Sequence, residues 1–282
     1  MNPQAPPATA AEIVRAAGSN LAFALAVLPR PIRADMRIFY AYCRHVDDIV
    51  DGTTASEAEK RAALERWRSL VRGESGVAPR PGLEQEMREV CERRELPIET
   101  LEEIIDGVAA DLTQDRFATF DDLKRYCYGV ASAVGLVSIE IFGYQDPESR
   151  VYAEELGYAL QLTNILRDVG EDAVEGRIYL PLEDLEKFDL TESALLARRH
   201  DERFERLMAF ECNRAEVFYR KAEEALPECD RRSMRSAELM RTIYSRILAR
   251  MKAGRFRVFE TRYRLGKAEM IGCLARALIV RT

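Results

Sequence analysis

The chain has 282 residues, of which 47% are hydrophobic and 32% are charged, and this composition is typical of a soluble globular protein. A net charge of −6 gives no global positive field, so the composition argues against nucleic acid as a partner. The six cysteines form no CxxC pair and suit reduced cytosolic thiols, and a count of two histidines nearly excludes histidine-based metal or triad chemistry.

The first ten residues, MNPQAPPATA, have neither a positive nor an apolar segment, so they predict a disordered tail and not a signal peptide. No later apolar run approaches the roughly 20 residues of a membrane-spanning helix. No segment alternates as a β-strand does, and we therefore predict a single all-α domain over residues 11–282. Helical periodicity between the prolines predicts helices at about 9–27, 32–51, 56–72, 83–95, 98–112, 120–142, 148–172, 201–226 and 231–253, with a short one after 267.

The stretch YAYCRHVDDIVDG, residues 40–52, carries three aspartates among apolar neighbours. Asp47 and Asp51 are four residues apart, so on a helix they share one face about 6 Å apart along the axis. Such a like-charge pair is unfavourable, and far more so when it is buried. The pattern therefore predicts a positive group between the two carboxylates.

The stretch QLTNILRDVGEDAVEGRIYLP, residues 161–181, repeats this arrangement. Three oxygen-bearing side chains recur at intervals of four: Asn164, Asp168 and Asp172. Each motif also carries an arginine, Arg44 or Arg167, of the kind that grips phosphate oxygens in pairs. Mg²⁺ takes oxygen ligands and shares them with substrate phosphates. Either motif alone is typical of a solvated helix surface, but the two together favour a cage for a small Mg²⁺ cluster.

The segments YAYCRHVDDIVD and LQLTNILRDVGEDAVEGRIYLP resemble the two aspartate-rich sequence signatures of the squalene/phytoene synthase family. The resemblance extends to YCYGVASAVG, IYSRIL and RYRLGK, and it covers about residues 15–275. Members of this family are all-helical isoprenoid synthases that join two prenyl diphosphates head-to-head with Mg²⁺. The resemblance thus implies a helical bundle with a central active-site cavity.

The resemblance also implies roles for individual residues. Two or three Mg²⁺ ions would be held by Asp47, Asp51, Asn164, Asp168 and Asp172. The catalytic residues would be Tyr126, beside the reacting allylic cation, and the diphosphate-binding Arg44 and Arg167. Matched substrate-binding positions are Gly18, Ser19, Asn20, Tyr40, Arg44, Asp48, Gln161, Arg167, Arg177, Tyr179, Tyr244 and Arg262. The alternative for Tyr126 is a packed core tyrosine, and for Asp48 it is a salt bridge to a neighbouring arginine.

One departure from the family occurs in GSNLAFALAVLP. The family commonly has a serine–phenylalanine pair here, whereas Leu21 replaces the aromatic residue. Ser19 and Asn20 still offer hydrogen-bond donors for a diphosphate, and Phe23 is a candidate substitute for the missing ring.

The wording VASAVG resembles bacterial presqualene diphosphate synthases of the hopanoid route more than it resembles phytoene synthases. We therefore predict Mg²⁺-dependent condensation of two farnesyl diphosphates to presqualene diphosphate, with NADPH needed only if the reaction continues to squalene. The alternative within the family is phytoene synthesis from two geranylgeranyl diphosphates, as in carotenoid formation. Alternatives from other classes are a non-catalytic helical subunit and a head-to-tail prenyltransferase, which would have DDxxD in both motifs.

We expect a cytoplasmic protein that binds prenyl diphosphates and touches the inner face of the cell membrane peripherally. Downstream enzymes of the same pathway are further expected partners. A basic stretch near the end could meet anionic headgroups at up to about 1 kcal/mol per residue: Arg250, Lys252, Arg255, Arg257, Arg262, Arg264 and Lys267. The alternative is that these arginines serve the diphosphate site or solvate a helix. Bulky residues expected to narrow the tunnel for the prenyl tail are Tyr128, Leu136, Ile139 and Leu160.

Overall fold

The computed structural model describes residues 8–17 and 23–279, and these residues form helices joined by short connections. The helices are α1 (Ala10–Ala17), α3 (Arg30–Asp51), α4 (Glu57–Arg72), α5 (Leu83–Arg94), α6 (Ile98–Ala110), α7 (Phe120–Cys127), α8 (Ala133–Phe142), α9 (Glu148–Val174), α10 (Leu182–Lys187), α11 (Glu192–Leu196), α12 (Glu202–Ala225), α13 (Arg235–Ala253) and α14 (Lys267–Ile279). Within the described ranges there is no strand, only an isolated bridge between Arg116 and Ile178. The all-α prediction is confirmed.

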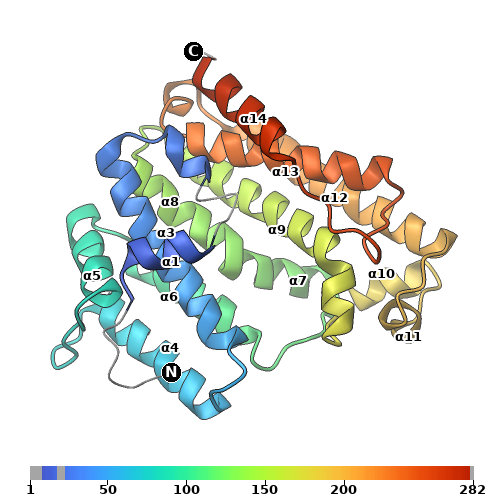
Figure 1. The fold of residues 1–282 in the computed structure, drawn as a ribbon, viewed down its shortest axis with the longest axis horizontal. Helices are drawn as coiled ribbons and strands as arrows, with labels where there is room; N and C mark the ends of the chain where they lie inside the picture. The colour runs from blue at the N-terminus through green and yellow to red at the C-terminus, as the bar shows by residue number, and fades with distance from the viewer. Residues whose placement is uncertain (1–7, 18–22, 280–282) are drawn as a thin grey trace.

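Helix α9 runs through the middle of the molecule and is flanked by α8, α12 and α13 (Figure 1). Helices α3 to α6 lie together on one side of the bundle, and α10 to α12 lie on the other (Figure 1). The C-terminal α14 packs against α13. This arrangement brings α3 and α9, the helices that carry the two acidic motifs, to opposite sides of one interior space.

Local sequence sets where several helices begin. The side chains of Ser56 and Thr119 each accept a hydrogen bond from the backbone amide three residues later. The acidic side chain at that later position accepts one in return from the amide of Ser56 or Thr119, which completes a capping box. The predicted helix over 120–142 is continuous in direction but contains a π turn at Tyr128–Ser132 between α7 and α8. In this turn Gly129 lies against the backbone of Gly107 on α6, at a spacing that leaves no room for a side chain.

Three segments differ from the sequence prediction. Of the helix expected over 9–27, the structure describes α1, two helical residues at 23–24 and a 3₁₀ turn at Leu25–Val27, and residues 18–22 lie outside the described ranges. Leu28 is extended because Pro29 follows it. Helices α10 and α11 were not predicted, since each has fewer than two turns and so shows no periodicity. Helix α13 begins at Arg235, four residues later than expected.

The predicted tail falls mainly outside the described residues. At its end, the amide of Thr9 donates to the Glu12 carboxylate, and the amide of Ala10 donates to Glu86 on α5. These two residues therefore belong to the start of α1. Gly18, Ser19, Asn20 and Leu21 also lie outside the described residues.

Candidate active site

An interior cavity of about 440 Å³ lies between α3, α6, α8, α9 and α13. On α3 its lining residues run from Met36 to Asp47, a distance of about 16 Å at 1.5 Å per residue. On α9 they run from Tyr152 to Asn164. In both helices the lining changes from apolar to polar toward the C-terminal end, so the cavity has one polar end and one apolar end.

The α3 side of the polar end carries the first acidic motif. Arg44 pairs with Asp47 at 3.2 Å and with Asp48 at 2.6 Å, so it neutralises one side of the motif and does not bridge Asp47 to Asp51. Partial burial, together with the nearby charge of Asp51, raises the pKa of Asp47 to about 6. Asp48 is half-exposed and its carboxylate contacts Arg44, as in the salt-bridge alternative for this residue.

The α9 side carries the second motif. Arg167 binds its neighbour Asp168 through two hydrogen bonds of 2.8 and 2.6 Å, a geometry that only a guanidinium provides. Burial and the charge of Asp168 raise the pKa of Asp172 to about 7. The amide oxygen of Asn164 is buried and has no hydrogen-bond partner among the described residues, while its amide nitrogen donates to Gln161 at 3.4 Å.

Arg177, in the GRIYLP segment after α9, links the two motifs electrostatically. Its positive charge lowers the pKa of Asp172 on α9 and of Asp111 at the end of α6, against the upward effect of burial on both. Burial lowers the pKa of Arg177 itself, but Tyr179 and Glu175, and to a smaller degree Asp111 and Asp51, raise it overall. The ion pair that its guanidinium makes is with Glu175, at 3.5 Å.

The donor set suits a hard divalent cation. Every candidate ligand is an oxygen, one of them is the unpartnered amide oxygen of Asn164, and two carboxylates have raised pKa values that a bound cation would lower. In the described part of the chain, no three acidic, histidine or cysteine side chains are already gathered as a ligand group. Asp47 and Asp168 are instead paired with arginines, so a cation at these two carboxylates would have to displace Arg44, Arg167 or Arg262.

Tyr126 shares one carboxylate with Tyr179. The two hydroxyls donate to different oxygens of Asp111, at 2.9 Å from Tyr126 and 3.1 Å from Tyr179. Their rings lie 5.5 Å apart, and Phe117 packs within 6 Å of both. Burial and the charge of Asp111 raise the pKa of Tyr126 well above its usual value, so this hydroxyl keeps its proton.

Asp111 is a residue that the sequence analysis missed. The signal for it was an acid immediately after α6, a position where the helix dipole disfavours negative charge. An acid that departs from this helix-dipole preference marks a position where a functional role is expected.

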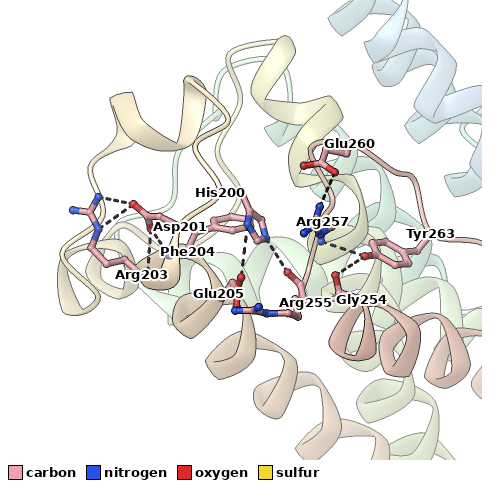
Figure 2. Close-up of polar contacts among 10 residues, drawn as sticks. All are labelled: His200, Asp201, Arg203, Phe204, Glu205, Gly254, Arg255, Arg257, Glu260 and Tyr263. Atoms are coloured by element: carbon pink, nitrogen blue, oxygen red, sulfur yellow. Dashed lines mark hydrogen bonds and ion pairs between the residues drawn. The ribbon is translucent and has the colours of Figure 1, made fainter.

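A segment between α13 and α14, here called the C-terminal strap (residues 254–266), covers the end of α9 that carries the second motif. Figure 2 shows how the strap is closed on itself: the Tyr263 hydroxyl donates to the carbonyl of Gly254 and accepts from the amide of Arg257, both at 3.2 Å. His200 contacts the carbonyl of Arg255 at 2.8 Å, and Glu205 on α12 pairs with the guanidinium of Arg255 (Figure 2).

The strap delivers Arg262 to the second motif. The guanidinium of Arg262 lies 3.2 Å from Asp168 and 2.9 Å from Glu171. Glu171 is a further contact that the sequence analysis did not single out.

The remaining predictions concern residues that bind the substrate and residues that narrow the tunnel. Tyr40, Gln161 and Tyr244 line the cavity, and the guanidinium of Arg167 lies 6.0 Å from the centre of the Tyr244 ring. Of the residues expected to narrow the tunnel, Ile139 and Leu160 line the cavity, Leu136 is buried outside it, and the Tyr128 hydroxyl donates to Glu103.

The basic stretch is largely neutralised. The ion pairs are Arg250 with Glu269, Lys252 with Glu216, Arg255 with Glu205, Arg257 with Glu260, and Arg262 with Asp168 and Glu171. Most of the predicted positive surface is therefore engaged within the protein.

Comparison with known proteins gives one family. The family model described as squalene/phytoene synthase matches residues 14–269. A phytoene synthase from Arthrospira platensis is 36% identical over an alignment of 266 positions that covers 89% of this chain and 85% of that one. The chain spans 58% of the length of the chloroplastic phytoene synthase 1 of Arabidopsis thaliana.

Two solved structures have the same fold. The crystal structure of a dehydrosqualene synthase in complex with ligand has a TM-score of 0.84 and 25% identity, covering 95% of this chain and 94% of that one. The squalene synthase HpnC from Alicyclobacillus acidocaldarius has a TM-score of 0.78 and 28% identity, covering 88% and 93%.

Proposed function

The chain belongs to the squalene/phytoene synthase family of prenyltransferases, and on that premise we propose that it condenses two farnesyl diphosphates head-to-head to presqualene diphosphate, with release of pyrophosphate. One observation carries the proposal. Two oxygen-rich helix faces, each with its own arginine, border the polar end of a long cavity whose other end is apolar. Such a cavity fits a ligand with a diphosphate head and a hydrocarbon tail.

The polar end would hold the diphosphates. Arg44, Arg167 and Arg262 would leave their carboxylate partners and bind phosphate oxygens, with Tyr40 and Gln161 as further donors. Mg²⁺ would be held by Asp47, Asp51, Asn164, Asp168 and Asp172, and when bound it supplies neutralisation of the leaving pyrophosphate. Asp47 and Asp168, which now pair with arginines, would then pair with the metal.

The apolar end would hold the prenyl tail and protect the reaction. The carbon–oxygen bond of one allylic diphosphate breaks, the 2,3-double bond of the second molecule attacks the cation, and loss of one proton closes the cyclopropane ring. Water in the cavity would quench the cation, and side chains such as Val134, Ile139 and Leu156 keep it out. The Tyr126 hydroxyl, held by Asp111, would face the positive charge with its ring and its oxygen.

The C15 substrate is supported by the wording VASAVG and by the names of the two structural neighbours, a dehydrosqualene synthase and a squalene synthase. A second candidate is favoured by a different observation. The curated relative at 36% identity is a phytoene synthase, which supports condensation of two geranylgeranyl diphosphates.

Incubation of the purified protein with each prenyl diphosphate and Mg²⁺, followed by chromatography of the extracted products, tests both candidates. We expect presqualene diphosphate from farnesyl diphosphate without NADPH, and no product after chelation of Mg²⁺. Added NADPH shows whether the product goes on to squalene. Phytoene from the C20 substrate with little product from the C15 one would overturn the substrate assignment, and no head-to-head product from either would overturn the proposed reaction.

We also propose that the protein is cytoplasmic and contacts the membrane peripherally through α14. Among the described helices none is long and apolar enough to cross a membrane. On α14, Ile271 and Leu278 are 61% and 55% exposed, whereas most of the neighbouring basic stretch is ion-paired. Flotation with anionic liposomes should therefore show binding that is lost in the double variant Ile271→Ser/Leu278→Ser and that high salt reduces only in part. Absence of flotation in the unchanged protein would contradict the membrane contact.

A further inference from the structure

A second cavity, of about 560 Å³, lies behind the apolar end of the first. Its walls come from the beginning of α3, from the turn at residues 142–145, and from the 229–235 segment before α13. Among the described residues, Phe142 is the one that lines both cavities. The two cavities therefore approach each other at Phe142.

The position of Phe142 identifies which end of the first cavity it closes. It is the last residue of α8, and the short turn at 143–147 leads directly into α9. The C-terminal end of α8 therefore lies beside the N-terminal end of α9, where Tyr152 lines the cavity (Figure 1). Asn164 at the polar end is three turns further along α9, about 18 Å away at 1.5 Å per residue.

The turn that follows Phe142 is anchored by hydrogen bonds. Gly143 ends α8 in the left-handed region, at φ 80°, a conformation that glycine adopts without strain. Beyond it, the buried Asp230 accepts hydrogen bonds from the amides of Gln145 and Asp146 and from the Ser149 hydroxyl, at 2.8 to 3.0 Å. Phe142 itself is 8% exposed. The ring is thus buried at the end of a helix whose following turn is anchored to Asp230.

We propose that the Phe142 ring is the end wall of the prenyl-tail cavity and sets the longest tail that the site accepts. The inference rests on the proposed function, because it takes the occupant to be a prenyl diphosphate with its head at the polar end. A tail one isoprene unit longer would have to pass Phe142 into the second cavity. Removing the ring would join the two cavities, and the additional carbons would follow the apolar wall of the second one at Val27, Leu28 and Ile32, away from its polar wall at residues 230–235.

The test measures binding of unreactive thiolo analogues of farnesyl and geranylgeranyl diphosphate by calorimetry, with Mg²⁺ present, together with product formation from the two substrates. In Phe142→Ala we expect the affinity for the C20 analogue relative to the C15 analogue to rise about tenfold or more, since apolar pockets discriminate by roughly this factor per missing or extra group. The matched control is Leu136→Ala, on the same helix, equally buried and lining neither cavity. Phe142→Leu serves as a milder variant that preserves folding.

Equal C20-to-C15 affinity ratios in Phe142→Ala, Phe142→Leu and the control would overturn the inference. The binding measurement separates this failure from failure of the proposed reaction. A protein that binds both analogues but forms no head-to-head product refutes the reaction, and the affinity ratio still decides whether Phe142 is the wall.

Discussion

Gly170 on α9 lies directly against the carbonyl oxygen of Val258 in the C-terminal strap, so closely that a Cβ atom at position 170 would overlap it. The strap can therefore rest on α9 only where the helix has no side chain. Four residues after Val258, Arg262 reaches Asp168 in the turn of α9 that precedes Gly170. The close approach at Gly170 thus fixes the position along α9 at which Arg262 of the strap contacts the second acidic motif.

Gly170→Ala should displace the strap and pull Arg262 away from Asp168. We expect about a tenfold rise in KM for the prenyl diphosphate with a smaller change in kcat, because a positioning contact to the diphosphate is lost while the chemical residues stay in place. Steady-state kinetics measures this. Gly272→Ala on α14, which has open space around it, is the matched control and should leave KM unchanged. Equal kinetics in the two variants would contradict a positioning role for the strap.

The acidic motifs were predictable because their spacing is a property of one helix. Asp47 with Asp51, and Asn164 with Asp168, share a face whatever the rest of the chain does. The residues that complete the site come from contacts across the fold. Asp111 meets Tyr179 from 68 positions away, and Arg262 meets Asp168 from 94 positions away, and no local periodicity encodes either pairing. The same holds for Phe142, whose effect depends on a second cavity formed by distant segments.

For the basic stretch at residues 250–267, the sequence predicted more free positive charge than the structure has. Local composition predicted a positive surface, but α12 and α14 supply carboxylates such as Glu216, Glu205 and Glu269 that pair with it. Charge counted along the chain therefore overstated the field that the folded surface presents. A sequence window contains no information about which helix packs beside it.

Asp47→Ala should abolish turnover while the protein stays folded. Its carboxylate is partly buried beside Asp51, so its removal relieves repulsion and should leave the melting temperature unchanged or higher. Asp168→Ala should also abolish turnover but lower the melting temperature, because it leaves the largely buried Arg167 without its two-point partner. Product assays with Mg²⁺ and thermal denaturation measure both effects. Near-normal activity in either variant would rule out a metal role for that residue.

Tyr126→Phe should lower kcat by about 10²-fold or more, in the range expected when a hydroxyl that assists proton transfer is removed. The variant leaves Asp111 with Tyr179 as its remaining tyrosine donor and should change the packing little, because the ring is retained. Neither tyrosine is among the residues that line the cavity, and they differ in the partner of the hydroxyl, so Tyr128→Phe, which removes a donor to Glu103 and not to Asp111, is the matched control. If both variants kept wild-type kcat, Tyr126 would be the packed core tyrosine of the alternative reading.

The last prediction concerns a buried charge cluster remote from the acidic motifs. Glu211 on α12 is 1% exposed, and both of its carboxylate oxygens lie 2.6 Å from Arg214, which also binds Asp184 at 2.8 Å. One guanidinium therefore serves two carboxylates. Burial, and to a lesser degree Asp184, raise the pKa of Glu211 to about 8, against the opposing effect of Arg214.

Because the pKa of Glu211 is higher in the folded protein than the ordinary value of 4.5, folding disfavours its ionised form. Its contribution to the free energy of unfolding is therefore most favourable below about pH 4.5, and it declines as the pH rises to about 8. The melting temperature should fall across this window, and Glu211→Gln, which cannot ionise, should flatten the slope. The control Glu216→Gln removes a half-exposed carboxylate that pairs with Lys252 and should keep the wild-type slope. Parallel melting curves for wild type and Glu211→Gln from pH 5 to 8.5 would show that Glu211 is already ionised in the folded protein, with Arg214 outweighing its burial.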